Sequence, residues 1–184
     1  MNAKPSIYDI SITGLTGEKI DLSTFKGKKI LITAGPTYEA IDPVRFIGNH
    51  STGKMGFDLA NEAAKLGAVV TLISGPTSLK VRHSDVKVIP VVSAQEMYDA
   101  CHLYYHSMDV VIAAAAVADY TPKSVANQKL KKTEGDLTIE LEKTKDILAS
   151  LGAAKKNQLL IGFALETENE LEHAKLKIQK KNLD

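Results

Sequence analysis

The chain has 184 residues, 44% of them hydrophobic and 24% charged, which is typical of one ordinary soluble globular domain. Its formal net charge of +1 provides no general attraction to nucleic acid or to an anionic membrane, so neither partner is expected. No apolar run approaches the roughly 20 residues that span a bilayer, and the start lacks a signal peptide's apolar core, so we expect a cytoplasmic protein. The single cysteine, Cys101, excludes an internal disulfide and favours a buried free thiol.

The first element along the chain is predicted over residues 6–32, where apolar and polar residues alternate. This pattern predicts a two-stranded β-hairpin, with Ile10 and Ile12 facing inward and the letters TGEK as its turn. The segment resembles the start of a glutathione-peroxidase-type thioredoxin fold. A peroxidase, however, needs a cysteine soon after the next strand, where this chain has Gly35 and Pro36. We therefore expect a hairpin extension over residues 1–27, followed by a separate domain over residues 28–184.

From Lys28 onward, short apolar strands alternate with amphipathic helices. The strands are predicted over residues 28–35, 69–75, 108–120 and 158–166, with a half-exposed strand over 135–143. The helices are predicted over 55–68, 93–106, 145–156 and 168–181, and the second opens with a capping box of Ser93 and Glu96. The alternation predicts an α/β fold, namely a Rossmann-like, doubly wound, mostly parallel sheet with helices on both faces.

Residues suited to a nucleotide follow three of these strands. In a doubly wound sheet, ligands bind beyond the carboxyl ends of the strands, where the strand order reverses. GPTYEAIDPVRFIGNHSTGKM, AAAAVADY and GFALET stand at such ends, and each is rich in small or charged residues. NAD-dependent redox chemistry is disfavoured, since the first strand–helix turn lacks the dinucleotide fingerprint G-x-G-x-x-G.

The letters GNHSTGKM have the glycine and lysine spacing of a phosphate-binding P-loop. Met55 replaces the hydroxyl that would hold Mg²⁺, and Gly48 lies thirteen residues beyond Gly35, so neither motif nor context fits. The helix N-terminus near Gly53 can still favour an anion. The alternative is that Ser51 only caps this helix.

The longer stretch ITAGPTYEAIDPVRFIGNHSTGKMG (32–56) resembles the signature of the phosphopantothenoylcysteine synthetase family, the ligase half of the bacterial bifunctional flavoprotein of coenzyme A biosynthesis. The resemblance continues in AAAAVADY, KLKK (129–132), TKDIL (144–148), GFALET (162–167) and AKLKIQKKNLD (174–184), and covers about residues 28–184. Because the family runs on beyond KNLD, the resemblance implies a chain that is C-terminally truncated relative to it. No flavin is expected in this chain.

The resemblance implies a CTP-dependent ligation of phosphopantothenate with cysteine. The phosphopantothenate carboxylate attacks the α-phosphate of CTP to form an acyl-cytidylate and pyrophosphate, and the amine of cysteine then displaces CMP. Such chemistry needs countercharge, usually Mg²⁺ with Lys or Arg, although no metal ligand is assignable from the sequence. The resemblance also implies a homodimer. The alternative is a truncated or recombined nucleotide-binding module without ligase activity.

The resemblance further implies roles for individual residues. Asn49 would contact the acyl group of the cytidylate, and Arg45 would steady the same loop or the substrate. Asp119 would accept hydrogen bonds from the nucleotide, and Lys129 would meet the triphosphate. The other nucleotide-binding residues implied are Ala113, Ala114, Ala115, Lys145, Asp146, Ile147, Leu148, Phe163, Lys177 and Lys181. For three of these a plainer interpretation stays open, since Lys177 and Lys181 can form a solvated helix face and Phe163 can belong to the core.

Overall fold

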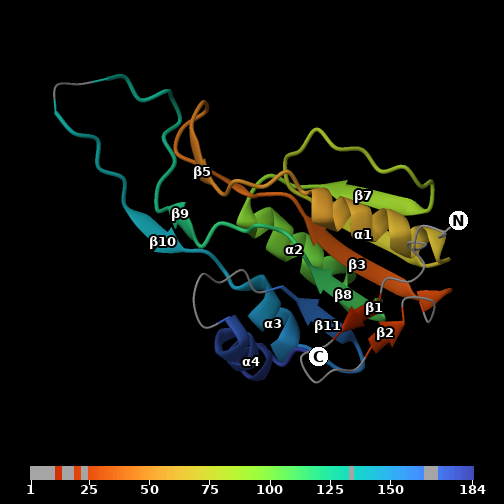
Figure 1. Ribbon diagram of the computed structural model, residues 1–184. Helices are drawn as coiled ribbons and strands as arrows, with labels where there is room; N and C mark the ends of the chain where they lie inside the picture. Colours follow the sequence, from red (N-terminus) through yellow and green to blue (C-terminus); the bar gives the residue numbers. More distant parts are fainter. Residues whose placement is uncertain (1–10, 14–18, 22–24, 133–134, 164–169) are drawn as a thin grey trace, which may run out of the picture.

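The computed structural model describes residues 11–13, 19–21, 25–132, 135–163 and 170–184. Its centre is a five-stranded sheet in the order β11-β8-β3-β6-β7, in which every neighbouring pair is parallel (Figure 1). These strands are β3 (Lys29–Ala34), β6 (Val69–Ser74), β7 (Val86–Pro90), β8 (Val110–Ala113) and β11 (Leu159–Gly162). The Rossmann-like, parallel α/β fold expected from the sequence is confirmed.

Helices cover both faces of this sheet, as the sequence predicts. Successive side chains of a strand point to opposite faces, so Ile30 and Ile32 pack with α1 (Lys54–Lys65) in one core cluster. Leu31 packs on the other face with α2 (Ala94–Tyr105) and α3 (Ile147–Ala153). The last helix, α4 (Glu170–Lys181), contacts α3. No helix in the described part of the chain is both long and apolar enough to cross a membrane.

The strand order reverses between β3 and β8. The chain proceeds from β3 to β6 and β7 on one side, and returns to β8 and β11 on the other. The carboxyl ends of β3, β8 and β11 are therefore neighbours, and they are the three strand ends at which the sequence places its nucleotide-suited residues. A parallel sheet opens for a ligand at this kind of reversal.

Several predicted boundaries were wrong. The segment between β3 and α1 contains a hairpin of β4 (Tyr38–Ala40) and β5 (Phe46–Gly48). The strand predicted over 108–120 ends at Ala113. The half-exposed strand predicted over 135–143 is only β10 (Leu141–Lys143), whose three residues are all exposed. β10 pairs antiparallel with β9 (Tyr120–Pro122), and the two strands form the base of an arm that extends from the sheet (Figure 1). We use the word arm for β9, β10 and the described residues between them, 123–132 and 135–140. Strand β7 was not anticipated: its letters VKVIP include three apolar β-branched residues, but the run is short and ends in proline, which counts against a strand.

The predicted N-terminal hairpin is confirmed. Strand β1 (Ser11–Thr13) pairs antiparallel with β2 (Lys19–Asp21), and Ile12 lies opposite Ile20. Ile10 and most of the TGEK turn lie outside the described residues.

The predicted burial of Cys101 is also confirmed. This thiol on α2 is free and has no exposed surface. Burial raises its pKa to about 12, so it stays a protonated, unreactive core group at neutral pH.

The contact between α3 and α4 depends on Gly152. A Cβ atom at this position would lie 1.9 Å from the carbonyl oxygen of Lys181. Asn182 closes the same contact, since its side-chain amide donates to the carbonyl of Gly152 at 3.0 Å. Any side chain at residue 152 must therefore push α4 away from α3.

We expect Gly152→Ala to lower the free energy of unfolding by about 2 kcal/mol, since overpacking a tight contact costs about 1–3 kcal/mol. Chemical denaturation measures this change. Ala153→Ser, at the exposed neighbouring position, is the matched control and should change stability by less than about 0.5 kcal/mol. Equal stability of the two variants would contradict the close contact.

Candidate functional site

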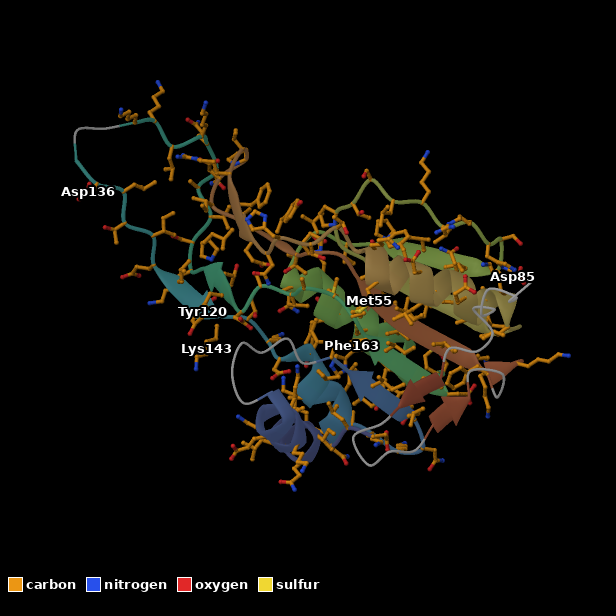
Figure 2. All side chains as sticks on the ribbon, viewed as in Figure 1. Met55, Asp85, Tyr120, Asp136, Lys143 and Phe163 are labelled. Carbon is orange, nitrogen blue, oxygen red and sulfur yellow. The ribbon has the colours of Figure 1, made fainter. Side chains whose placement is uncertain are left out.

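A cleft of about 540 Å³ lies at the carboxyl ends of β3, β8 and β11, within the size range of small-molecule sites. Its lining joins the end of β3, the segment after β8, the turn before α3, the end of β11 and one face of α4. The lining residues are Thr33, Ala113, Ala115, Val117, Ala118, Asp119, Tyr120, Lys143, Thr144, Lys145, Asp146, Ile147, Leu148, Phe163, Lys177 and Lys181. Figure 2 shows Phe163 near the end of β11, and Tyr120 and Lys143 on the paired strands β9 and β10.

The floor of the cleft is a segment of small residues that continues from β8. The hydroxyl of Thr33 accepts a hydrogen bond from the backbone N–H of Ala115 at 3.2 Å, and that of Thr37 accepts one from Ala118 at 2.9 Å. From the other side, the hydroxyl of Thr144 donates to the carbonyl of Ala118 at 2.6 Å. These bonds hold the backbone in place, and the alanine side chains leave room for a ligand to approach it.

Positive charge gathers around this cleft. Four lysines line it, together with two carboxylates, Asp119 and Asp146. Asp146 is itself engaged, because it accepts from the Ala149 N–H at 2.9 Å and pairs with Lys181 at 2.8 Å. Burial pushes the pKa of Asp146 upward, but the bonds from Lys181 and Ala149 and the charge of Lys177 outweigh it and hold the pKa below its ordinary value. A ligand with several negative charges suits such a cleft.

Asn49 ties the signature loop to the cleft floor. It follows β5, and its side-chain amide donates to the carbonyl of Val117 at 3.0 Å and to that of Ala116 at 3.4 Å. Asn49 itself is not among the residues that line the cleft. Asn49 therefore lies next to the cleft floor and binds the backbone of the floor segment.

Arg45 belongs to a second cluster, which we call the clamp, formed by Asp42, Arg45 and Leu130. The Arg45 guanidinium donates to the Asp42 carboxylate at 2.5 and 3.0 Å and to the Leu130 carbonyl at 2.9 Å. Asp42, only 2% exposed, also accepts from the backbone N–H groups of Val44, Arg45 and Leu130. The hydrogen bond from Arg45, with those from the three N–H groups, outweighs burial and holds the Asp42 pKa well below its usual range.

The clamp joins the β4–β5 hairpin to the segment that carries the KLKK letters. Lys129 directly precedes Leu130, is exposed, and does not line the cleft. Ala114 does not line it either, and its backbone N–H donates to the carbonyl of Thr33 at 3.2 Å. The structure therefore brings most of the sequence-predicted residues to one cleft and leaves Asn49, Arg45, Lys129 and Ala114 beside or outside it.

Some cleft residues were missed by sequence reasoning. Thr33 lies within a buried strand, and Thr144 is the first residue of TKDIL. Neither can be recognised as a cleft residue from the sequence, because the hydrogen bonds that each makes to the floor are seen only in the folded structure. Lys143 belongs to the predicted strand over 135–143, whose alternation suggested a half-buried face instead of a cleft wall.

Ser51 does not cap α1, which corrects one of the two sequence interpretations, whereas an anion at this helix N-terminus stays a prediction. The N-cap is Gly53, in the left-handed conformation with φ 80°, and Ser51 accepts from the N–H of Gly53 at 3.2 Å. Gly56 allows α1 to approach β3, because a Cβ there would lie 2.5 Å from that of Ala34. Within the described residues, no group of three or more His, Cys, Asp or Glu side chains could hold a metal ion.

Comparison with known proteins gives one family and several relatives. The profile of the DNA/pantothenate metabolism flavoprotein C-terminal domain matches residues 25–184. The chain is 54% identical over 159 residues to the coenzyme A biosynthesis bifunctional protein CoaBC of Bacillus subtilis (strain 168), an alignment covering 86% of this chain and 39% of that protein. It is 44% identical over 183 residues to CoaBC of Haemophilus influenzae, covering 99% and 45%. The chain thus spans less than half the length of these relatives.

Solved structures agree with the fold. The crystal structure of the C-terminal domain of a CoaBC protein superposes with a TM-score of 0.77 at 51% identity, covering 88% of this chain and 76% of that chain. A Cab2 mutant in complex with phosphopantothenate-cysteine superposes with a TM-score of 0.74 at 18% identity, covering 89% of this chain and 75% of that chain, and this likeness concerns the fold alone.

The clamp generates a prediction about the KLKK segment. We expect Asp42→Ala to speed tryptic cleavage after Lys129 by about tenfold, because Leu130 loses both its anchor and the ordered Arg45. The cleavage rate, followed by mass spectrometry, measures it. Asp58→Ala is the control, since Asp58 forms exposed ion pairs with Lys54 and Arg82 away from the clamp. Similar acceleration in both variants would contradict the clamp.

The same cluster predicts a pH dependence. Because the folded pKa of Asp42 is depressed, its stabilisation is complete above the unfolded aspartate value of about 3.9 and is lost only as pH falls through the lower folded value. The protection of the Leu130 amide against hydrogen exchange, corrected for intrinsic rates, should therefore be the same at pH 4 as at pH 7. Loss of protection between pH 5 and 4 would show an ordinary, unclamped aspartate.

Proposed function

Because the chain belongs to the family of the DNA/pantothenate metabolism flavoprotein C-terminal domain, we propose that it ligates phosphopantothenate to cysteine with CTP as the activating substrate. The observation that carries the proposal is the cleft where the strand order reverses, walled by lysines and floored by alanines. The relatives named above support it, since they are coenzyme A biosynthesis proteins.

The first step of the proposed reaction joins two anions. A carboxylate oxygen of phosphopantothenate attacks the α-phosphorus of CTP, pyrophosphate leaves, and an acyl-cytidylate results. Lysine ammonium groups lower the repulsion between the carboxylate and the triphosphate and stabilise the charge that develops on the leaving pyrophosphate. Lys143, Lys145, Lys177 and Lys181 surround the cleft where this charge is needed.

In the second step, the amine nitrogen of cysteine attacks the acyl carbon, CMP leaves, and the nitrogen loses a proton to water as the amide forms. The carbonyl oxygen becomes negative in the tetrahedral intermediate and needs hydrogen-bond donors. Asn49 is our candidate for this contact, with its amide beside the Val117 carbonyl at the edge of the floor. Asp119 is our candidate for accepting hydrogen bonds from the nucleotide. Lys129 is our candidate for a triphosphate contact, although it is outside the cleft lining here.

A Mg²⁺ ion fits this cleft only together with the triphosphate. Mg²⁺ in nucleotide sites is typically bound through one or two carboxylates and the substrate phosphates. Asp119 is an exposed carboxylate in the lining, whereas Asp146 already pairs with Lys181. Asp119 would therefore hold the ion, which when bound neutralises phosphate oxygens.

The direct test measures pyrophosphate release from CTP in the presence of phosphopantothenate and Mg²⁺, followed by CMP release when cysteine is added. We expect both products in sequence. Binding of CTP without either product would favour the alternative, a nucleotide-binding module without ligase activity. Absence of both binding and turnover would contradict the proposed function.

Helix α4 offers a matched pair of lysines for this test. Lys181 lines the cleft, whereas Lys180 is exposed and lies outside the lining. We expect Lys181→Gln to weaken CTP binding by about tenfold, because it removes a charge-assisted contact with phosphate. Lys180→Gln should change the affinity by less than about twofold. Titration calorimetry measures both, and equal effects would place the triphosphate elsewhere.

We also propose that the protein forms a homodimer through the arm and the β4–β5 hairpin. Large apolar side chains are exposed there, including Phe46, Val125, Leu137 and Leu141. Exposed apolar groups gathered on one projection indicate an interaction surface. Sedimentation velocity should give a dimer for the wild type and a monomer for the double variant Leu137→Glu/Leu141→Glu, whereas a monomeric wild type would contradict this interface.

A further inference from the structure

Three lysines of the cleft are held by different kinds of contact. Lys181 pairs with Asp146, and the Lys177 ammonium donates to the carbonyl of Phe163 at 2.6 Å. The Lys145 ammonium lies over the aromatic ring of Tyr98, 4.8 Å from its centroid. Tyr98 belongs to α2, a helix that contributes no residue to the cleft lining.

We propose that Tyr98 is a positioning residue for Lys145, holding this ammonium ready for the phosphates of the bound nucleotide. The inference rests on the proposed function, because it takes the ligand of the cleft to be a nucleoside triphosphate. The face of an aromatic ring is negative and attracts an ammonium group within about 6 Å. Unlike a carboxylate, the ring orients the lysine without adding a negative charge that would repel phosphate.

The contact with Tyr98 matters for binding because it orients Lys145 before the ligand arrives. Lys145 is exposed, and a free lysine side chain must lose much rotational freedom when it binds a phosphate. A lysine that is already oriented loses less of this freedom on binding, and the affinity rises accordingly. The Tyr98 ring supplies this orientation from outside the cleft.

Tyr98 is in turn held by the next turn of α2. The His102 ring packs against the Tyr98 ring with centroids 4.4 Å apart, and His102 Nε2 lies 2.9 Å from the Ser150 hydroxyl on α3. That hydroxyl donates its one proton to the Ile147 carbonyl at 2.7 Å, so Nε2 must carry a hydrogen and donate to Ser150. His102 thus ties α2 to α3 about one helical turn beyond Tyr98.

The N-terminus of α2 is fixed as well. The buried carboxylate of Glu39, on β4, accepts from the backbone N–H of Ala94 at 2.8 Å, and the Ser93 hydroxyl accepts from that of Glu96 at 3.1 Å. The ring of Tyr98 is therefore carried by a helix anchored at its start, at its core face and against α3. Such a platform can hold a lysine in one place.

The same helix provides a matched control. Lys87 lies over the ring of Tyr104 with 4.9 Å between ammonium and centroid, and its ammonium also donates a hydrogen bond to the Tyr104 hydroxyl at 3.3 Å. Neither residue lines the cleft. Replacing Tyr104 by leucine therefore removes a ring–ammonium contact, together with that hydrogen bond, without touching a cleft lysine.

The test is a double-mutant cycle on CTP affinity, measured by titration calorimetry with Mg²⁺ present. We expect Tyr98→Leu to weaken binding by about two- to fivefold, the strength of an exposed cation–π contact. Tyr98→Phe keeps the ring and should stay within about twofold of the wild type, as should Tyr104→Leu. In a Lys145→Gln background, Tyr98→Leu should have no further effect. Equal losses in both backgrounds would assign Tyr98 a merely structural role and overturn the proposal.

A second measurement is independent of any nucleotide. Reductive ¹³C-methylation labels the lysines, and the Lys145 signal is identified by its loss in Lys145→Gln. A ring above it should shift this signal upfield in the wild type and in Tyr98→Phe, and the shift should vanish in Tyr98→Leu. CTP binding without this shift overturns the proposal and leaves the proposed function standing. The shift in a protein that binds no CTP overturns the role toward phosphate, together with the proposed function.

Discussion

The reversal of strand order between β3 and β8 is the constraint on which the rest of the site depends. Neighbouring parallel strands whose connections diverge leave a gap at their carboxyl ends, and here the chain after β8 fills the floor of that gap with small residues. Hydroxyls of Thr33 and Thr37 bind the backbone of this floor, and Thr144 fastens it from the opposite wall. Each of these hydrogen bonds pairs a backbone group of the floor and restricts its movement. A ligand therefore meets a surface that is set before it arrives.

Three of the lysines around the cleft are each held by a contact with a different kind of partner. Lysines alone would repel one another, whereas a carboxylate partner for every lysine would cancel the positive charge of the cleft. The structure combines a carboxylate partner for Lys181, a carbonyl partner for Lys177 and an aromatic partner for Lys145. The cleft consequently remains positive while its lysines are restrained. Asp146 serves two elements at once, because it caps α3 and binds α4.

Away from the cleft, hydrogen bonds to a buried carboxylate, Asp42, hold the arm and the β4–β5 hairpin together in place of apolar packing. None of the described side chains over 123–132 and 135–140 is buried, so apolar burial does not fix the path of the arm. Asp42, almost wholly buried, instead collects donors from the hairpin and from the arm and orders both. A carboxylate that is paired and hydrogen-bonded in this way remains ionised well below its usual pKa. The contacts of Asp42 and Arg45 with Leu130 also position Lys129, the preceding residue, although Lys129 itself makes none of them.

Sequence by itself determined the α/β class, the main helices, the central strands other than β7, and the family, because apolar periodicity and local signature letters survive without any knowledge of contacts. It also determined which letters stand at the strand ends. Only the tertiary structure decided which of these ends meet, that Ala114 is not part of the cleft lining, and that Arg45 binds Asp42 and Leu130. The physical reason is that these outcomes depend on pairs far apart in the chain, such as Arg45 with Leu130 or Lys145 with Tyr98. The sequence contains both residues of each pair, but only the folded backbone brings the two within contact distance.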